Sequence, residues 1–180
     1  MSIMELSYFY TMEYLPTRYE ASQSEWNNRR AVWNFKDGNC SNVIIDSLVN
    51  YVNHIACGNK SDYVICFIPA STSYKTSNRF GYVSQKLTNR TGVQATLSAI
   101  KKSTDSESGH IAGKSCNPTA DFEFDSYYFR GKKVILIDDV ITRGRTFSDT
   151  AIKMINKGAL SVVGLFVAKT VNPDRNIVAA

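Results

Sequence analysis

Two adjacent carboxylates followed by a polar loop are the residues of this chain best suited to chemistry. Asp138 and Asp139 come directly after residues 134–137, an apolar run rich in β-branched residues that predicts a strand buried on both faces. Paired acids at the end of a buried strand are costly unless they meet a partner. The loop that follows consists of Val140, Ile141, Thr142, Arg143, Gly144, Arg145 and Thr146.

This loop lies just before an amphipathic helix, where backbone N–H groups and the positive end of the helix dipole favour an anion. Ligands of open α/β sheets bind outside the carboxyl ends of the strands. The sequence therefore predicts a phosphate site at residues 142–146, with two acids beside it that accept hydrogen bonds from ribose hydroxyls or hold Mg²⁺ through its waters. A purely structural alternative, with Thr146 as N-cap and Asp149 three residues on, leaves the paired acids unexplained.

Residues 135–146 resemble the phosphoribosyl-pyrophosphate (PRPP) binding motif of type I phosphoribosyltransferases: four apolar residues, two acids, two apolar residues and a Thr/Gly-rich loop. The resemblance implies an α/β fold with a central, mostly parallel β-sheet flanked by helices and a small N-terminal hood. It implies a pentosyltransferase that moves the 5-phosphoribosyl group between PRPP and an acceptor, releasing pyrophosphate, with Mg²⁺ as cofactor. Arg143 departs from the motif, because many members have a small or hydroxyl residue there.

The same resemblance implies roles for single residues. Asp138 and Asp139 contact the ribose and orient Mg²⁺ through water, and together with Lys102 they are the predicted catalytic residues. The 5′-phosphate and ribose site comprises Asp138, Asp139, Thr142, Arg143, Gly144, Arg145 and Thr146.

A second polar loop follows the predicted strand 63–68, again at a strand's carboxyl end and before a helix, predicted over residues 77–88. In the resembling family this loop binds pyrophosphate. The predicted pyrophosphate residues are Ser71, Thr72, Ser73 and Lys75. Lys75 and Arg79 are the expected charged helpers, and the alternative is an ordinary Ser/Thr-rich surface loop.

Residues 101–120 have no hydrophobic periodicity, and a loop of this length is usually functional or disordered. Family members carry a flexible loop at this place, which closes over PRPP and excludes water. Lys101, Lys102, His110 and Lys114 are its candidate functional residues, with simple solvation as the alternative.

The repeated order of strand, polar loop and helix predicts one domain over residues 1–180. Within it we expect a hood at 1–36, an α/β core at 37–170 and a tail at 171–180. Helices are expected to start at Ser22 or Ser24 and at Ser41, which are good N-caps. Residues 3–20 are rich in aromatic residues and fit neither a helix nor an alternating strand.

Two short stretches, 32–38 and 79–85, resemble segments of ComF-like competence-associated members of the family. Together with a net charge of +5 they leave a ComF-like nucleic-acid-associated protein as an alternative, although the basic residues are spread out and form no run. A catalytically silent PRPP- or nucleotide-binding regulatory protein is the other alternative. The acceptor cannot be read from the sequence, and a nitrogenous base is the expectation.

Cys40, Cys57, Cys66 and Cys116 match no zinc-binding spacing. No signal peptide or membrane span is recognisable, so we expect a cytoplasmic protein without membrane contact. A homodimer is an expectation from the resembling family.

Overall fold

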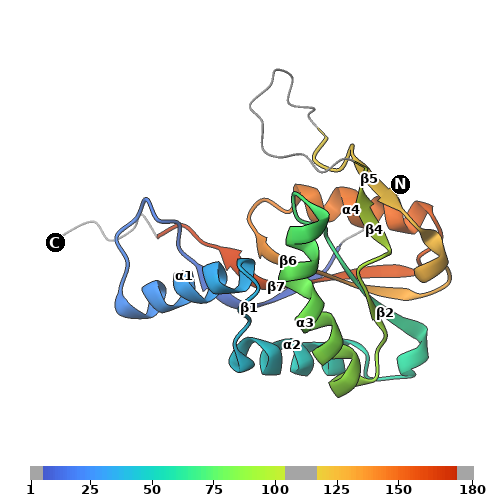
Figure 1. Ribbon diagram of the computed structural model, residues 1–180, viewed down its shortest axis with the longest axis horizontal. Helices are drawn as coiled ribbons and strands as arrows, with labels where there is room; N and C mark the ends of the chain where they lie inside the picture. The colour runs from blue at the N-terminus through green and yellow to red at the C-terminus, as the bar shows by residue number, and fades with distance from the viewer. Residues whose placement is uncertain (1–5, 104–116, 174–180) are drawn as a thin grey trace.

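The computed structural model of the chain describes residues 6–103 and 117–173. Its main sheet has five parallel strands in the order β1-β7-β6-β2-β3 (Figure 1). The strands are β1 (Tyr8–Tyr14), β7 (Ser161–Thr170), β6 (Lys133–Ile141), β2 (Tyr63–Phe67) and β3 (Ala95–Thr96). Apolar residues in the middle of β2, β6 and β7 are buried, as expected for strands covered on both faces. The predicted α/β class, with a mostly parallel central sheet flanked by helices, is confirmed.

Helices cover both faces of this sheet. They are α1 (Gln23–Lys36), α2 (Asn42–Ile55), α3 (Ser73–Thr91) and α4 (Arg145–Asn156). One core cluster joins α1, α2 and α3 to residues such as Ile135 and Ile137 of β6, and the other joins α4 to Val134 and Leu136. In Figure 1, α2 and α4 lie on opposite sides of the sheet. Successive side chains of β6 therefore alternate between the two layers.

The direction of the chain connections reverses between β2 and β6. From β2 the chain passes through α3 to β3 at one edge, whereas from β6 it passes through α4 to β7, away from that edge. Because β2 and β6 are neighbours, the connections that follow them diverge on opposite faces of the sheet. Ligands of such sheets bind at this reversal of strand order, outside the carboxyl ends of the strands.

A small antiparallel hairpin packs on the α4 side. It consists of β4 (Ile100–Lys102) and β5 (Phe122–Phe124), with Ile100, Phe122 and Phe124 in or against the α4 core cluster. Two 3₁₀ turns, η1 (Lys60–Asp62) and η2 (Ser126–Tyr128), precede β2 and β6.

Helix starts follow their capping residues. The Ser22 hydroxyl accepts the Glu25 amide in a capping box, and Ser41 caps α2, so these predicted starts are confirmed. The prediction for α3 is wrong by four residues at its start. Thr72 Oγ1 accepts the Lys75 amide at 3.1 Å and caps the helix there.

Residues 8–14, for which the sequence predicted no element, form the edge strand β1. It pairs with β7 from Tyr8 opposite Gly164 to Tyr14 opposite Thr170. This strand is therefore part of the core sheet, which the predicted core of residues 37–170 left out. The hood at 1–36 stays a prediction for the remainder of that range, where the described element is α1. No helix in the described ranges is long and apolar enough to cross a bilayer.

Candidate active site

Strand β6 extends further than its sequence predicted. It continues past Ile137 to Ile141, because β7 still pairs with it there, with Asp138 opposite Phe166. Strand β2 stops earlier, and its last pair joins Phe67 to Ile137. The two acids therefore lie on a part of β6 that has lost its neighbour on the β2 side, at the reversal of strand order described above.

The two adjacent acids face different layers of the fold, because side chains alternate along a strand. Asp138 shares the face of Leu136, toward α4, and Asp139 shares the face of Ile137, toward α1 and α3. The acid pair thus supplies one carboxylate to each face of the sheet.

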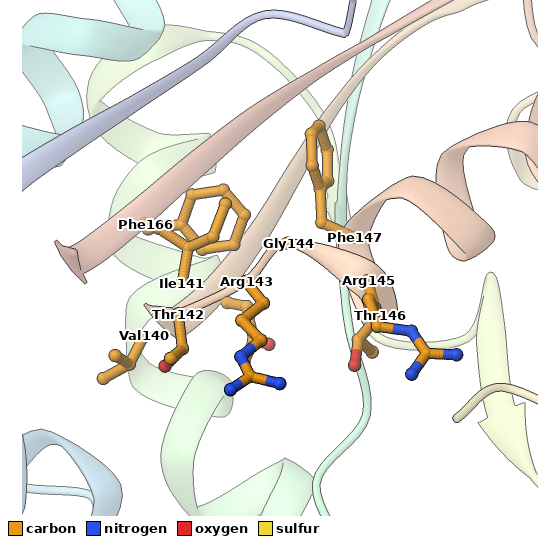
Figure 2. A pocket seen from close by; sticks show the side chains of 10 residues that line it. Val140, Ile141, Thr142, Arg143, Gly144, Arg145, Thr146, Phe147 and Phe166 are labelled. Carbon is orange, nitrogen blue, oxygen red and sulfur yellow. The ribbon is translucent and has the colours of Figure 1, made fainter. Parts of the chain in front are cut away.

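A pocket of about 290 Å³ lies on the Asp138 side, where β6 leads into α4. Its lining is Asp138, Val140, Ile141, Thr142, Arg143, Gly144, Arg145, Thr146, Phe147 and Phe166. Figure 2 shows both guanidinium groups and the hydroxyls of Thr142 and Thr146 on one side of the loop, and the ring of Phe147 on the other. All five residues predicted to bind the 5′-phosphate are thus gathered with Asp138 at one pocket.

The amino end of α4 opens into this pocket. Gly144, with φ +72°, is the N-cap and provides no side-chain cap. The first backbone bond of the helix runs from the Ser148 amide to the Gly144 carbonyl, at 2.8 Å. The amides of residues 145–147 come before that bond and, with the helix dipole and two arginines, favour an anion. The alternative with Thr146 as N-cap is wrong, since Thr146 lies inside the helix.

Asp139 is held by two cations from the other layer. Its Oδ2 lies 2.6 Å from Arg79 Nη1 of α3 and 3.6 Å from Lys36 Nζ at the end of α1. Its Oδ1 accepts the Val140 amide at 2.6 Å. Asp139 is 7% exposed and does not line the 290 Å³ pocket. Both oxygens of the Asp139 carboxylate are therefore already engaged by groups of the protein.

The Asp138 carboxyl has a different environment. It is half-buried, and its Oδ1 accepts the Asp139 amide at 2.7 Å. Burial raises the pKa of Asp138 well above its ordinary value, and the neighbouring Asp139 carboxylate raises it further, while Arg79 and Lys36 oppose this rise. Hydrogen bonds from ligand hydroxyls, or a nearby cation, would stabilise the ionised form of this carboxyl.

The second predicted loop is only partly a loop. Ser71 and Thr72 precede α3, whereas Ser73 and Lys75 lie in its first turn. Ser73 lines a pocket of about 200 Å³ whose other residues are Pro69, Thr76, Ser77, Leu97, Ser98, Ile100 and Lys101. Ser71, Thr72 and Lys75 do not line this pocket. Thr72 is used as the cap of α3, and the pyrophosphate role of these residues stays a prediction.

Lys101 and Lys102 lie in strand β4, so the prediction of a flexible loop that begins at residue 101 is wrong for these two residues. Lys101 lines the 200 Å³ pocket beside the start of α3, and Lys102 Nζ lies 3.1 Å from Asp121 Oδ2. Lys102 is thus paired within the hairpin, and its catalytic role stays a prediction. His110 and Lys114 lie outside the described residues.

No group of three or more His, Cys, Asp or Glu side chains that could hold a metal ion occurs within residues 6–103 and 117–173. Among the predicted metal contacts, Asp138 is the carboxylate that lines the pocket. A cation there would be bound largely by ligand oxygens and water, as is usual for Mg²⁺.

Sequence reasoning missed Lys36 and paired Arg79 with pyrophosphate, whereas its partner is Asp139. One residue near Lys36, Gly38, could have indicated this contact in the sequence. Gly38 has φ +87°, and a Cβ atom there would come within 2.7 Å of the Asn78 carbonyl oxygen. The chain after α1 therefore approaches α3 one residue before Arg79, which brings Lys36 to the same carboxylate.

No protein-family model matches the sequence, and no curated protein matches it. Among solved structures the chain is similar to the allosteric regulatory enzyme of purine biosynthesis, with 17% identity over 76% of this chain and a TM-score of 0.49. It spans 30% of that longer chain. Adenine phosphoribosyltransferase from Saccharomyces cerevisiae has 19% identity, with 72% of this chain and 70% of that chain covered and a TM-score of 0.42. Purine phosphoribosyltransferase from Pyrococcus horikoshii has 14% identity, with 76% and 90% covered and a TM-score of 0.40.

Proposed function

We propose that this protein is a phosphoribosyltransferase, which transfers the 5-phosphoribosyl group between PRPP and a nitrogenous base. The observation that carries the proposal is one pocket of about 290 Å³ that joins the half-buried Asp138 to the amino end of α4 and two arginines. A sugar phosphate has hydroxyls and a dianionic group a few ångströms apart, and this pocket offers an acceptor and an anion site side by side.

In this proposal the 5′-phosphate binds the amides at the start of α4, together with Arg143 and Arg145. Thr146 adds a hydroxyl donor. Asp138 accepts hydrogen bonds from the ribose hydroxyls, which fixes the orientation of the sugar relative to the phosphate. Such fixing of both ends of the sugar lowers the entropic cost of the transfer.

The reacting carbon is the anomeric carbon of the ribose. Its bond to the pyrophosphate oxygen breaks, the electron pair leaves with pyrophosphate, and a bond to a base nitrogen forms. The proton that this nitrogen carried passes to water or to the departing pyrophosphate. The leaving group is highly charged, so charge neutralisation is the main task of the protein. The 200 Å³ pocket with Ser73 and Lys101 offers donors for pyrophosphate at the neighbouring strand end.

Mg²⁺ fits this donor set through Asp138 and water, and it would neutralise charge on the pyrophosphate. Asp139 is a weaker candidate for direct contact with Mg²⁺ or ribose, since its two oxygens already serve Arg79, Lys36 and the Val140 amide.

One observation favours a second candidate, a protein that binds PRPP without transferring it. Arg143 lines the phosphate pocket with an exposed side chain. A second positive charge beside Arg145, on the phosphate side of the sugar, can hold the ligand tightly without assisting departure of pyrophosphate. Arg143→Thr separates the two, because it restores the residue type common in the resembling family.

The test is release of pyrophosphate from PRPP in the presence of Mg²⁺ and a panel of purine and pyrimidine bases. Base-dependent release by the wild type, lost in Asp138→Asn, supports the transferase. Binding of PRPP without release by the wild type, with release gained in Arg143→Thr, supports the binding protein. Asp46→Asn, at an exposed carboxylate on α2, is the control and should match the wild type.

A further inference from the structure

Asp139 is the point at which three separate elements meet. Arg79 of α3 and Lys36 of α1 both reach its Oδ2, at 2.6 and 3.6 Å, while its backbone belongs to β6. The three residues are far apart in the sequence, and the acid is nearly buried. A buried carboxylate is stable only with such partners, because burial of an unpaired charge is costly.

The two cations are not equivalent. The Arg79 side chain is 15% exposed and makes the short contact, whereas Lys36 is 43% exposed and makes the longer one. Within the described residues, Arg79 Nε is buried without a hydrogen-bond partner. A buried donor is rarely left unsatisfied, so the position of the guanidinium is set by the hydrogen bond from Nη1 to Asp139 and not by a bond from Nε.

Contacts on both sides of Asp139 link Arg79 to the pocket. Arg79 holds Asp139 Oδ2, and Asp139 Oδ1 accepts the Val140 amide at 2.6 Å, which fixes the peptide group between Asp139 and Val140. The preceding peptide group carries the Asp139 amide, which donates to Asp138 Oδ1 at 2.7 Å. The two peptide groups meet at the Asp139 Cα, so fixing the Asp139 side chain restricts the backbone from which the pocket carboxylate is oriented.

We propose that Arg79 and Lys36 are positioning residues, which act through Asp139 to hold the Asp138 carboxylate where a sugar-phosphate ligand meets it. The inference rests on the proposed function, because the ligand is taken to be PRPP. Neither cation lines the 290 Å³ pocket, and both approach Asp139 from the α1 and α3 layer, on the opposite face from Asp138. Their effect on the ligand is indirect.

The experiment measures the Kd of PRPP with Mg²⁺ by calorimetry, together with thermal unfolding, for a matched set of variants. Arg79→Gln removes the short contact, Arg79→Lys keeps the charge, and Arg79→Gln/Asp139→Asn removes both charges at once. Arg90→Gln is the control, because Arg90 lies on the same helix and pairs with Asp46 at 2.7 Å on the surface.

We expect Arg79→Gln to raise the Kd by about 10- to 100-fold, the range typical of groups that orient a ligating side chain. Lys36→Met should raise it by about fivefold at most, because an exposed ion pair contributes little. Arg79→Lys and the double variant should both bind more tightly than Arg79→Gln. Should Arg79→Gln fail to fold, these two variants decide the matter.

Equal Kd values for Arg79→Gln and Arg90→Gln would overturn the positioning role, even with a lower melting temperature. A double variant as weak as Arg79→Gln would also overturn it, since direct contact of Arg79 with the ligand predicts that result. Failure of the folded wild type to bind PRPP would instead overturn the proposed function, and this inference with it.

Discussion

Gly164 of β7 and Phe147 of α4 are in such close contact that a side chain cannot be added between them. A Cβ atom at Gly164 would lie 2.9 Å from Cε2 and Cζ of Phe147 and 2.7 Å from the ring of Phe166. Both rings line the 290 Å³ pocket, and they pack edge to face with centroids 5.4 Å apart. The absence of a side chain on β7 therefore sets the position of the first turn of α4.

Gly164→Ala should destabilise the protein by about 1–3 kcal/mol, because the extra methyl group overpacks this contact. It should also weaken PRPP binding, because Phe147 belongs to the first turn of α4, whose backbone amides are proposed to bind the 5′-phosphate. Urea unfolding measures the first effect and calorimetry the second. Gly81→Ala is the matched control: nothing lies within 4 Å of a Cβ atom there, and in helix α3 the change should be stabilising by about 0.5–1 kcal/mol. Similar effects of the two substitutions would contradict this account.

Asp138 should cost stability at neutral pH. Its pKa is raised in the folded protein, first by burial and then by Asp139. The folded state therefore holds its proton more tightly than the unfolded state, and stability falls as pH rises from the ordinary carboxyl pKa, about 4, through the raised value. Asp138→Asn should thus have a higher urea midpoint than the wild type at about pH 8, with the difference shrinking toward about pH 4. An equal or lower midpoint at the higher pH would contradict the prediction.

Arg29 secures the segment between β1 and α1. Its side chain is buried, at 1% exposure, and donates to the carbonyls of Leu15, Pro16 and Tyr19 at 2.7–2.8 Å. Arg29→Met should lower the free energy of unfolding by about 2–5 kcal/mol, because one buried and two part-buried carbonyls lose their donor. Arg30→Met, at an exposed neighbour, should change it by about 0.5 kcal/mol or less. Chemical unfolding of the two variants side by side makes the test.

Thiol reactivity should report burial of the core. Burial raises the pKa of Cys66 and of Cys40 to about 12, whereas Cys57 is exposed. At about pH 8 a thiol reagent should label Cys57 rapidly and leave Cys66, which is buried in β2, unmodified until the protein is denatured, because only the thiolate reacts. Cys40 is half-buried, so Cys40→Ser/Cys57→Ser/Cys116→Ser is the variant that isolates Cys66. Rapid labelling of this native variant would show that the sheet opens.

Capping residues and buried strands were the part of the fold that sequence reasoning predicted well. Ser22 and Ser41 start α1 and α2 as expected, since a hydroxyl before an amphipathic pattern has one obvious use. In the run from Ser71 to Ser77, several hydroxyls compete for the cap, and packing selects Thr72. Strand β1 was missed because its residues are nearly all half-buried, which hides the alternation expected of a strand.

The candidate site also has a part that could be predicted from local sequence and a part that could not. The phosphate loop and Asp138 are local in sequence, so the spacing of 138–146 was enough to predict that they come together. The separation of Asp138 from Asp139 depends on β6 continuing to Ile141, which only its pairing with β7 reveals. The contact of Arg79 with Asp139 joins residues on different elements, and no local pattern records it.

Calorimetric titration of the protein with PRPP, with and without Mg²⁺, tests the central claim most directly. The account predicts Mg²⁺-dependent binding by the wild type and a Kd raised at least about tenfold in Asp138→Asn, because that carboxylate lines the pocket. Asp46→Asn should bind like the wild type. Failure of the folded wild type to bind PRPP, or equal binding by Asp138→Asn, would contradict the account.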